Sequence, residues 1–265
     1  VFNYYMKNLL EPLNKNCSVE WNADNLDNEP SGCVATALSQ VLRFHQYPDA
    51  PVSGSRNTVR LGRKLSSPYY WTSEMRALRG GDGSGSGYDW NSMVLVPESS
   101  YVNLTERQRQ AIGALNYDAG VAVGMNYTGT SSGSVADTLL CAEALTDFFS
   151  YSNAVKGYNA DSNIGAGLNN MINPNLDSGR PVLLGVTGTN GGHAIVCDGY
   201  GYHSETMYHH LNMGWAGTDD VWYNLPDISA GIQFNSVYKA VYNIYKSGSG
   251  EIISGRVLDV DGNPV

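Results

Sequence analysis

The stretch GCVATALSQVLRFHQYP, residues 32–48, decides the fold. Apolar residues recur in it at helical spacing, at Val34, Ala37, Leu38, Val41 and Leu42. This spacing predicts a helix from Cys33 to Gln46, with Ser31 as its N-cap and Pro48 closing it. A cysteine therefore opens a helix directly after Gly32, a residue without a side chain.

Outside this helix, the predicted elements change in type along the chain. Helical patterns recur at about 105–119, 134–149 and 164–176, whereas residues 49–90 are rich in Gly and Ser. Apolar runs between Gly-rich turns then predict five strands, Val182–Val186, His193–Cys197, Met207–Leu211, Val221–Asn224 and Val237–Tyr245. Helices in the first half and strands in the second indicate an α+β protein of two lobes.

Composition argues against several classes of function. The net charge is −9 and no Lys/Arg run is longer than a pair, so neither nucleic acid nor an anionic membrane surface is an expected partner. No apolar stretch approaches the ~18 residues of a membrane span. Only 15% of the residues are charged, which favours an extracellular protein. Residues 1–10 lack the pattern of a signal peptide, so we expect a processed or trimmed product.

The last twenty residues differ from the rest. Residues 247–250, Ser-Gly-Ser-Gly, have the composition of a flexible linker, and a predicted strand with an Asp-Gly-Asn turn follows. This unit resembles the opening of carboxypeptidase-regulatory-like β-sandwich domains. We therefore expect one domain over residues 1–245, and over 246–265 a linker and the first strand of a truncated second domain. Alternatively, that strand packs on the first domain.

Cys33 is the first candidate functional residue. A helix N-terminus carries partial positive charge and free N–H groups, which stabilise a thiolate and can donate to an oxyanion. The alternative interpretation is a buried structural cysteine, the commoner role of a lone Cys. The other cysteines are Cys17, Cys141 and Cys197. No Cys-x-x-Cys pair occurs, so we expect neither a zinc site nor a disulfide.

His193 is the candidate base. It follows Gly191-Gly192 and begins an apolar strand, so its ring can be accessible while the strand fixes its backbone. A hairpin centred between Tyr202 and His203 would place His193 opposite Asn212, close enough for a hydrogen bond to one ring nitrogen. A one-residue slip would turn Asn212 to the other face.

The remaining histidines favour structural roles. We expect His45 to be a hydrogen-bonded core residue and His203 to lie in a turn. His209 and His210 are adjacent on a strand and point to opposite faces, so no metal site is predicted. The order Cys33, His193, Asn212, with 160 and then 19 residues of separation, is the order of papain-like enzymes.

Three groups of residues resemble the streptopain (C10) family of cysteine peptidases. The first is Gly32–Ala37 with Gln40 and Tyr47-Pro48; the second is Gly191–Ala194 with Asp198-Gly199; the third is Asn212 followed by Gly214–Gly217. Further matches are Tyr117–Val123, Ser131–Ser134 and Gly179–Val182. Together they cover residues 5–245 in the family's order.

The resemblance implies a papain-like fold with two lobes, a helical lobe carrying Cys33 and an antiparallel β lobe carrying His193. It also implies secretion from a bacterium, an inhibitory pro-segment and no cofactor. Its substrate-cleft residues correspond to Ser132 and Ser134, and its S2 pocket residue to Thr187.

Two positions depart from the family's pattern. Met213 follows Asn212 where the family has Trp, so we expect Trp215 to shield the His193–Asn212 bond. The family's oxyanion-hole Gln corresponds to Asp27, a carboxylate that repels an oxyanion. Asn28 or Asn25 can substitute for it as the oxyanion donor, or the backbone N–H of Cys33 contributes more of the oxyanion stabilisation.

The expected activity is that of a secreted endopeptidase with protein or peptide substrates. Cys33 attacks the peptide carbonyl as a thiolate paired with imidazolium His193, forming a thioester that water hydrolyses, while Asn212 orients His193. One alternative is a cysteine amidase or a transglutaminase-like enzyme. The other is a non-catalytic binding or adhesion module that keeps the fold.

Overall fold

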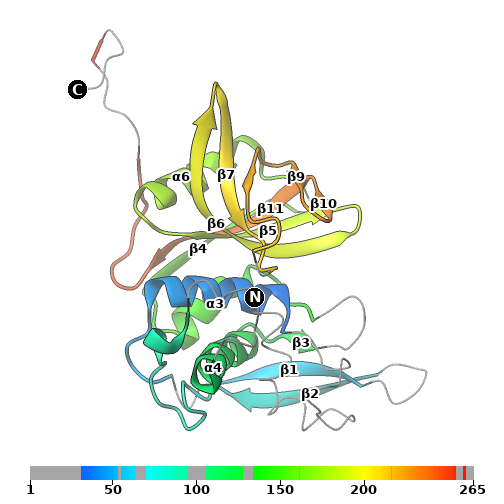
Figure 1. The fold of residues 1–265 in the computed structure, drawn as a ribbon, viewed down its shortest axis with the longest axis vertical. Coiled ribbons are helices and arrows are strands. Elements are labelled where there is room, and N and C mark those ends of the chain that lie inside the picture. The colour runs from blue at the N-terminus through cyan, green and yellow to red at the C-terminus, as the bar shows by residue number, and fades with distance from the viewer. Residues whose placement is uncertain are drawn as a thin grey trace.

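The computed structural model describes residues 31–52, 55–63, 70–94, 105–127, 134–160, 162–215, 217–254 and 259–260. These residues form two lobes, with helix α3 (Cys33–His45) lying along their junction (Figure 1). None of the described helices combines the length and apolar character needed to cross a membrane.

The first lobe holds most of the helices. Its elements are α3, α4 (Glu106–Ala122), the short α5 (Leu140–Glu143), and a sheet in the order β2-β1-β3 from β1 (Arg56–Arg63), β2 (Tyr70–Ala77) and β3 (Asn126–Tyr127). A π-helical turn, Ala144–Phe148, extends α5, and a 3-10 turn, Trp90–Ser92, precedes α4. α3 packs against α4 because its apolar stripe, including Leu38, Val41 and Leu42, is fully buried.

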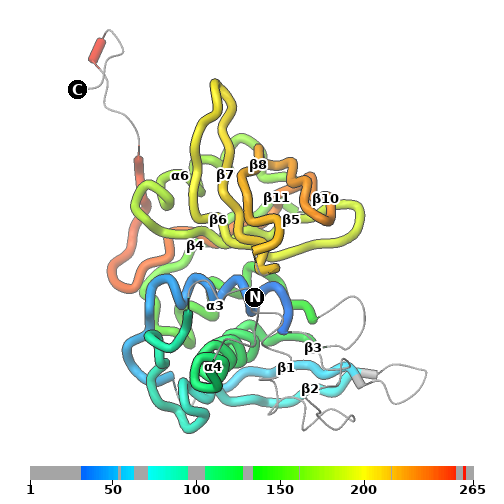
Figure 2. The backbone as a smooth tube through the Cα atoms, in the orientation of Figure 1, coloured from blue at the N-terminus to red at the C-terminus, as the bar shows by residue number. Residues whose placement is uncertain are grey.

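The second lobe is built on a six-stranded antiparallel sheet in the order β4-β11-β5-β6-β7-β8. Its strands are β4 (Asn153–Tyr158), β5 (Val182–Gly188), β6 (Gly191–His203), β7 (Thr206–Asn212), β8 (Trp222–Tyr223) and β11 (Ser236–Tyr245). Helix α6 (Leu168–Asp177) packs on this sheet, and β9 (Ile228–Ser229) pairs with β10 (Gln233–Phe234). The tube in Figure 2 shows the β6–β7 hairpin projecting away from α3.

Strand β6 contributes to both hydrophobic cores. Ala194 and Val196 join the core that contains α3, whereas Ile195 and Cys197 join the core of the β lobe. Successive side chains of a strand point to opposite faces, which explains this alternation. The sheet therefore holds the backbone around His193 against the helix that carries Cys33.

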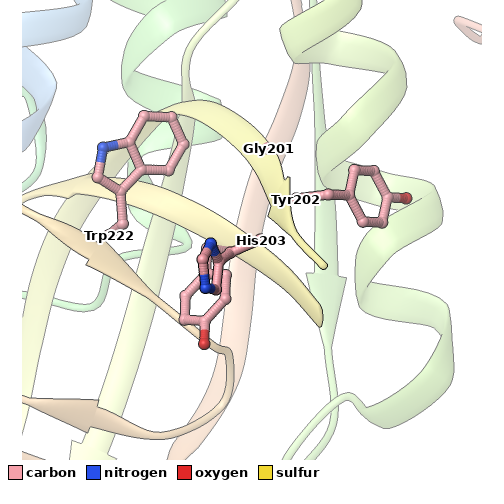
Figure 3. A pocket seen from close by; sticks show the side chains of 5 residues that line it. Gly201, Tyr202, His203 and Trp222 are labelled. Carbon is pink, nitrogen blue, oxygen red and sulfur yellow. The ribbon is translucent and has the colours of Figure 1, made fainter. Parts of the chain in front are cut away.

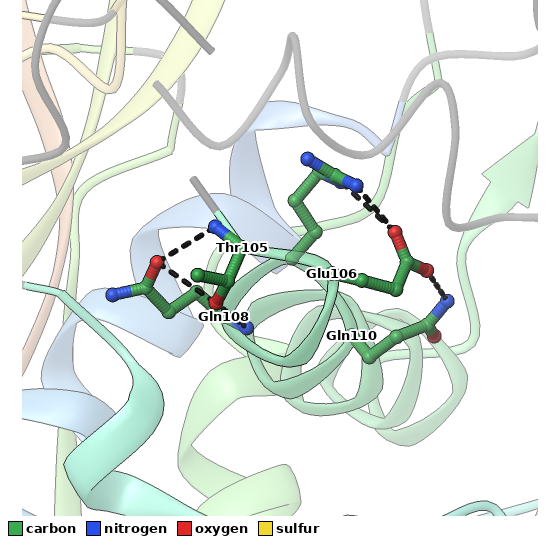
Figure 4. A network of polar contacts seen from close by, with 5 residues as sticks. Thr105, Glu106, Gln108 and Gln110 are labelled. Atoms are coloured by element: carbon green, nitrogen blue, oxygen red, sulfur yellow. Dashed lines mark hydrogen bonds and ion pairs between the residues drawn. The ribbon is translucent and has the colours of Figure 1, made fainter. Parts of the chain in front are cut away.

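A capping box fixes the start of α4 (Figure 4). The Thr105 hydroxyl accepts the N–H of Gln108 at 3.3 Å, and the Gln108 carboxamide oxygen accepts the N–H of Thr105 at 2.9 Å. Glu106 additionally pairs with Arg109 and accepts from Gln110. Such reciprocal bonds satisfy donors that a helix start leaves free.

The N-cap predicted for α3 is wrong. The cap is Gly32, with φ 85° and ψ 148°, and the Ser31 hydroxyl instead contacts the Thr36 hydroxyl at 3.4 Å. A Cβ on Gly32 would lie 2.8 Å from the carbonyl oxygen of Ser134. Glycine is required here by both its backbone conformation and its close packing.

Other predicted elements need correction. The helix predicted over 134–149 begins only at Leu140, because Val135 forms a β-bridge with Asn126. β1, β2 and β4 lie in segments for which no strand was predicted. Of the tail, residues 251–254 form no strand and 255–258 lie outside the described residues.

Candidate active site

Cys33 lies at the first position of α3 and is half-buried. The backbone N–H groups of Ala194, Val34 and Cys33 itself lie near its thiol. Burial raises the pKa of the Cys33 thiol, and these three N–H groups oppose that rise. Since Ala194 directly follows His193, strand β6 brings the candidate base next to the candidate nucleophile.

The His193 ring is held by a backbone carbonyl. Its Nε2 lies 2.8 Å from the Met213 oxygen, and a carbonyl can only accept, so Nε2 carries the proton. In neutral His193 the lone pair is then on Nδ1, the nitrogen free to act as a base. Burial lowers the pKa of His193, and the bond to Met213 raises it in part.

Two aromatic rings stack with the imidazole. The Trp215 ring stacks on His193 with centroids 4.9 Å apart and planes 24° apart, and the Phe234 ring follows at 6.0 Å and 17°. Phe234 is fully buried and Trp215 half-buried. The expectation that Trp215 covers the histidine agrees with this stacking, although the bond it covers goes to Met213.

The predicted pairing of His193 with Asn212 is wrong. The β6–β7 turn lies at Ser204–Glu205, and a bulge between Cys197 and Gly199 shifts the register, so that Asn212 opposes Val196. His193 instead opposes Val186 on β5. The later turn and the additional residue in β6 account for the difference.

Asn212 acts on the loop that holds the histidine. Its Oδ1 accepts the N–H of Gly214 at 3.0 Å and the Nε2–H of Gln40, on α3, at 2.8 Å. The N–H of Met213 donates to Asp220 Oδ1 at 2.7 Å. These contacts fix the peptide on either side of the Met213 carbonyl. Sequence reasoning missed Asp220 and this carbonyl; the side chain–backbone turn typical of Asn-x-Gly was the available signal.

The structure describes only some of the residues predicted to line the substrate cleft. Ser134 is buried next to Gly32, and Thr187 on β5 pairs with Gly192, one residue before His193. Both therefore adjoin the Cys33–His193 region. Ser132, Asn28, Asn25 and Asp27 lie outside the described residues.

Of the other histidines, His45, His209 and His210 agree with expectation, whereas His203, expected in a turn, is the last residue of β6 and pairs with Thr206. His45 Nδ1 bonds the Tyr151 hydroxyl at 3.0 Å, and burial is the main cause that lowers its pKa to about 4. His209 is buried and bonds Asn173, whereas His210 pairs with Asp198 on the other face. Within the described ranges no group of His, Cys, Asp or Glu is arranged to hold a metal ion.

A separate aromatic pocket of about 390 Å³ lies on the outer part of the β6–β7 hairpin (Figure 3). It is lined by Gly201, Tyr202, His203, Tyr208 and Trp222. The Trp222 ring lies within van der Waals distance of the Gly199 and Gly201 positions. The pocket lining contains no cysteine, so it offers no nucleophile like Cys33.

Comparison with known proteins gives two relatives that are similar in sequence. The chain is 29% identical over 195 residues to streptopain of Streptococcus pyogenes serotype M28 (strain MGAS6180), covering 74% of the chain and 45% of the relative. It is 26% identical over 189 residues to the thiol protease/hemagglutinin PrtT of Porphyromonas gingivalis, covering 71% and 19%. The chain thus spans less than half the length of these relatives.

Among solved structures, active wild-type interpain A cysteine protease of Prevotella intermedia is similar with a TM-score of 0.66 and 26% identity, covering 88% of each chain. A prointerpain A fragment (mutant C154A) of the same organism is similar with a TM-score of 0.60 and 24% identity, covering 84% and 65%. The fold is therefore the α+β fold of this cysteine protease. The model of the peptidase C10 family matches residues 8–223, and the chain belongs to that family.

Proposed function

We propose that the chain hydrolyses peptide bonds, with Cys33 as nucleophile and His193 as base. Cys33 attacks the carbonyl carbon while His193 Nδ1 holds the thiol proton, and that proton then passes to the leaving amine. Water, deprotonated by the same nitrogen, hydrolyses the thioester. The substrates are proteins or peptides, which are cleaved at internal peptide bonds.

One observation carries this proposal. The His193 Nε2–H is committed to the Met213 carbonyl, which leaves the Nδ1 lone pair free, and the backbone N–H of the next residue, Ala194, opposes the rise in the pKa of the Cys33 thiol. The same contact favours sulfur that carries negative charge. Desolvation raises the pKa of Cys33 and lowers that of His193. At a pH between these two pKa values, the pair therefore holds one proton, either on the Cys33 sulfur or on His193 Nδ1.

Asn212 contributes as a positioning residue, through the loop that presents the Met213 carbonyl. Trp215 shields that bond from water by stacking on the ring. For the oxyanion we propose the backbone N–H of Cys33, with Asn28 as a further donor. Ser132, Ser134 and Thr187 line the cleft in this proposal.

The proposal extends to processing and location. The similarity to a prointerpain A fragment supports an inhibitory pro-segment for this chain as well. The weakly charged composition and the relatives from Streptococcus, Porphyromonas and Prevotella support a secreted or cell-surface bacterial enzyme. We propose no cofactor and no metal.

The test combines activity with thiol labelling. Cys33→Ala is expected to abolish cleavage of a protein substrate and retain the circular dichroism spectrum, whereas Cys141→Ala, at a fully buried cysteine whose pKa burial raises, stays active. His193→Ala should slow iodoacetamide labelling of Cys33 at least tenfold at pH 7. Cleavage retained by Cys33→Ala would contradict the proposal, and cross-linked products instead of fragments would support a transglutaminase-like enzyme.

A further inference from the structure

The junction of the two lobes contains a second polar pocket, at the end of α3 opposite to Cys33. It has a volume of about 290 Å³ and is lined by His45, Ser178, Arg180, Ile244, Lys246 and Ser247, together with Gly179. α3 is 13 residues long, so at 1.5 Å per residue roughly 18 Å separates its two ends. The pocket is therefore distinct from the candidate active site.

Three elements from both lobes build this pocket. His45 ends α3 in the helical lobe, Arg180 follows α6, and Lys246 follows β11 in the β lobe. All three bear or can bear positive charge. Among the described residues that line the pocket, none is acidic. This concentration of cations is unusual for a chain with a net charge of −9.

In their contacts with the described part of the chain, the cationic groups leave hydrogen-bond donors unused. Lys246 Nζ donates to the His45 carbonyl oxygen at 3.0 Å, which leaves two of its three N–H groups. The Arg180 guanidinium lies over the Tyr245 ring, 5.1 Å from its centroid, and makes no ion pair with a described residue. A guanidinium that stacks by its face keeps its edge N–H groups available to bind oxygen atoms.

The pKa of His45 is affected by the positive charge in this pocket. Burial lowers its pKa to about 4, and the charges of Lys246 and Arg180 add to that effect. The uncharged groups that face this ring are Tyr151, which bonds Nδ1, and Phe44, whose ring centroid lies 5.4 Å away. An anion between the two cations would offset their repulsion of a protonated imidazole.

We propose that this pocket binds a small tetrahedral oxyanion, phosphate or sulfate, between Arg180 and Lys246. Arg180 supplies its N–H edge, which matches the oxygens of phosphate in a bidentate geometry. Lys246 supplies point charge, and the Ser247 hydroxyl a further donor. The volume suits a small ligand, since drug-sized ligands occupy pockets of about 300 to 1,000 Å³. A bound anion links the end of α3 to the β lobe.

The test measures binding without reference to peptidase activity. Thermal unfolding of the Cys33→Ala chain is followed against millimolar phosphate, sulfate or acetate, at an ionic strength kept constant with NaCl. Phosphate and sulfate are expected to raise Tm in a saturable manner, by about 3 °C at ten times the dissociation constant. Acetate should bind at least tenfold more weakly, because it has one charge and two oxygens.

Variants assign the effect to the pocket. Arg180→Gln and Lys246→Gln should each weaken binding at least tenfold, judged against the anion-free Tm of the same variant. Arg60→Gln, at an exposed arginine on β1, removes the same charge elsewhere and should bind as the parent does. Equal saturable shifts in all variants, a shift that does not saturate, or acetate as the tighter ligand would each overturn the proposal.

A second measurement stays valid where the variants lose stability. NMR titration of the histidine rings, with the His45 signal identified by its loss in His45→Gln, is expected to show phosphate raising the His45 pKa while the His203 signal stays in place. An unchanged His45 pKa at saturating phosphate would contradict a site between Lys246 and Arg180.

Discussion

Replacing Asn212 by Ala tests how the histidine is held. The substitution removes the acceptor for Gln40 Nε2 and for the Gly214 N–H. Gln40 Oε1 is already buried without a partner among the described residues, so the whole Gln40 carboxamide would lose the hydrogen bond it makes to them. Leaving buried polar groups unpaired costs about 1–3 kcal/mol, which lowers Tm by roughly 2–10 °C in a chain of this size.

The effect on catalysis should be smaller than that of losing a direct partner. The Met213 carbonyl stays bonded to His193, and the Met213 N–H stays bonded to Asp220. We expect kcat/KM to fall about tenfold, which corresponds to ~1.4 kcal/mol, and the acid limb of its pH profile to stay in place. Removing a group that orients the base directly costs up to about 10⁴-fold in rate.

The assay combines thermal unfolding with the pH profile of kcat/KM on a peptide substrate. Asn224→Ala, at an exposed Asn of the same lobe that bonds the Met207 carbonyl, is the matched control. In the double variant with Gln40→Ala, the stability losses should be less than additive by about 0.5–2 kcal/mol. A loss of 10³-fold or more with unchanged Tm and a displaced acid limb would refute the reasoning and restore a direct Asn212–His193 contact.

Three further predictions follow from backbone conformation and from the pKa shifts. Gly32→Ala should lower the free energy of unfolding by about 1–3 kcal/mol and remove most activity, since its Cβ would lie 2.8 Å from a carbonyl oxygen. Gly165→Ala, at a glycine with φ 77° and nothing within 4 Å, should lower it less in the same urea titration. The pH profile of kcat/KM should be a broad bell, because burial lowers the pKa of His193 and raises that of Cys33. Its acid limb should lie below the ordinary histidine pKa of about 6.5, and its alkaline limb above the ordinary cysteine pKa of about 8.5. Limbs at or inside those values would contradict the burial argument. Burial lowers the pKa of His209 to about 4, so the unfolded chain binds the proton first as the pH falls. The free energy of unfolding should therefore decrease between pH 6.5 and pH 4, by about 2 kcal/mol after solvent screening. His209→Gln should flatten this slope in urea unfolding at the two pH values, and an unchanged slope would exclude His209 as its source.

The sequence allowed the helix that begins at Cys33 and the strand that carries His193 to be predicted, because the first has helical periodicity after Gly32 and the second is an apolar run after Gly191-Gly192. α3 begins at Cys33 as predicted, and β6 contains the predicted strand. The resemblance to the C10 family was confirmed by the family comparison. The roles of the individual site residues stay predictions.

The site's third member could not be predicted from the sequence, because hairpin register depends on bulges and turn position. One bulge between Cys197 and Gly199 and a turn at Ser204–Glu205 moved the position opposite Asn212 from His193 to Val196. A backbone carbonyl leaves no residue-type signal, so Met213 looked only like a departure from the family's pattern. β1 and β2 escaped prediction because charged residues, such as Arg60 in β1 and Glu74 in β2, interrupt their apolar pattern.

The contacts of the imidazole limit how the proposed catalysis can be organised. A half-turn of this ring, which stacks with Trp215 and Phe234, would break the bond of its Nε2 to the Met213 oxygen. In the proposed mechanism, the proton taken from sulfur must then leave from the same nitrogen that received it. Acylation and deacylation thus share one proton-transfer path, and the amine and the incoming water must occupy the same position in succession. Departure of the amine product therefore has to precede entry of the water.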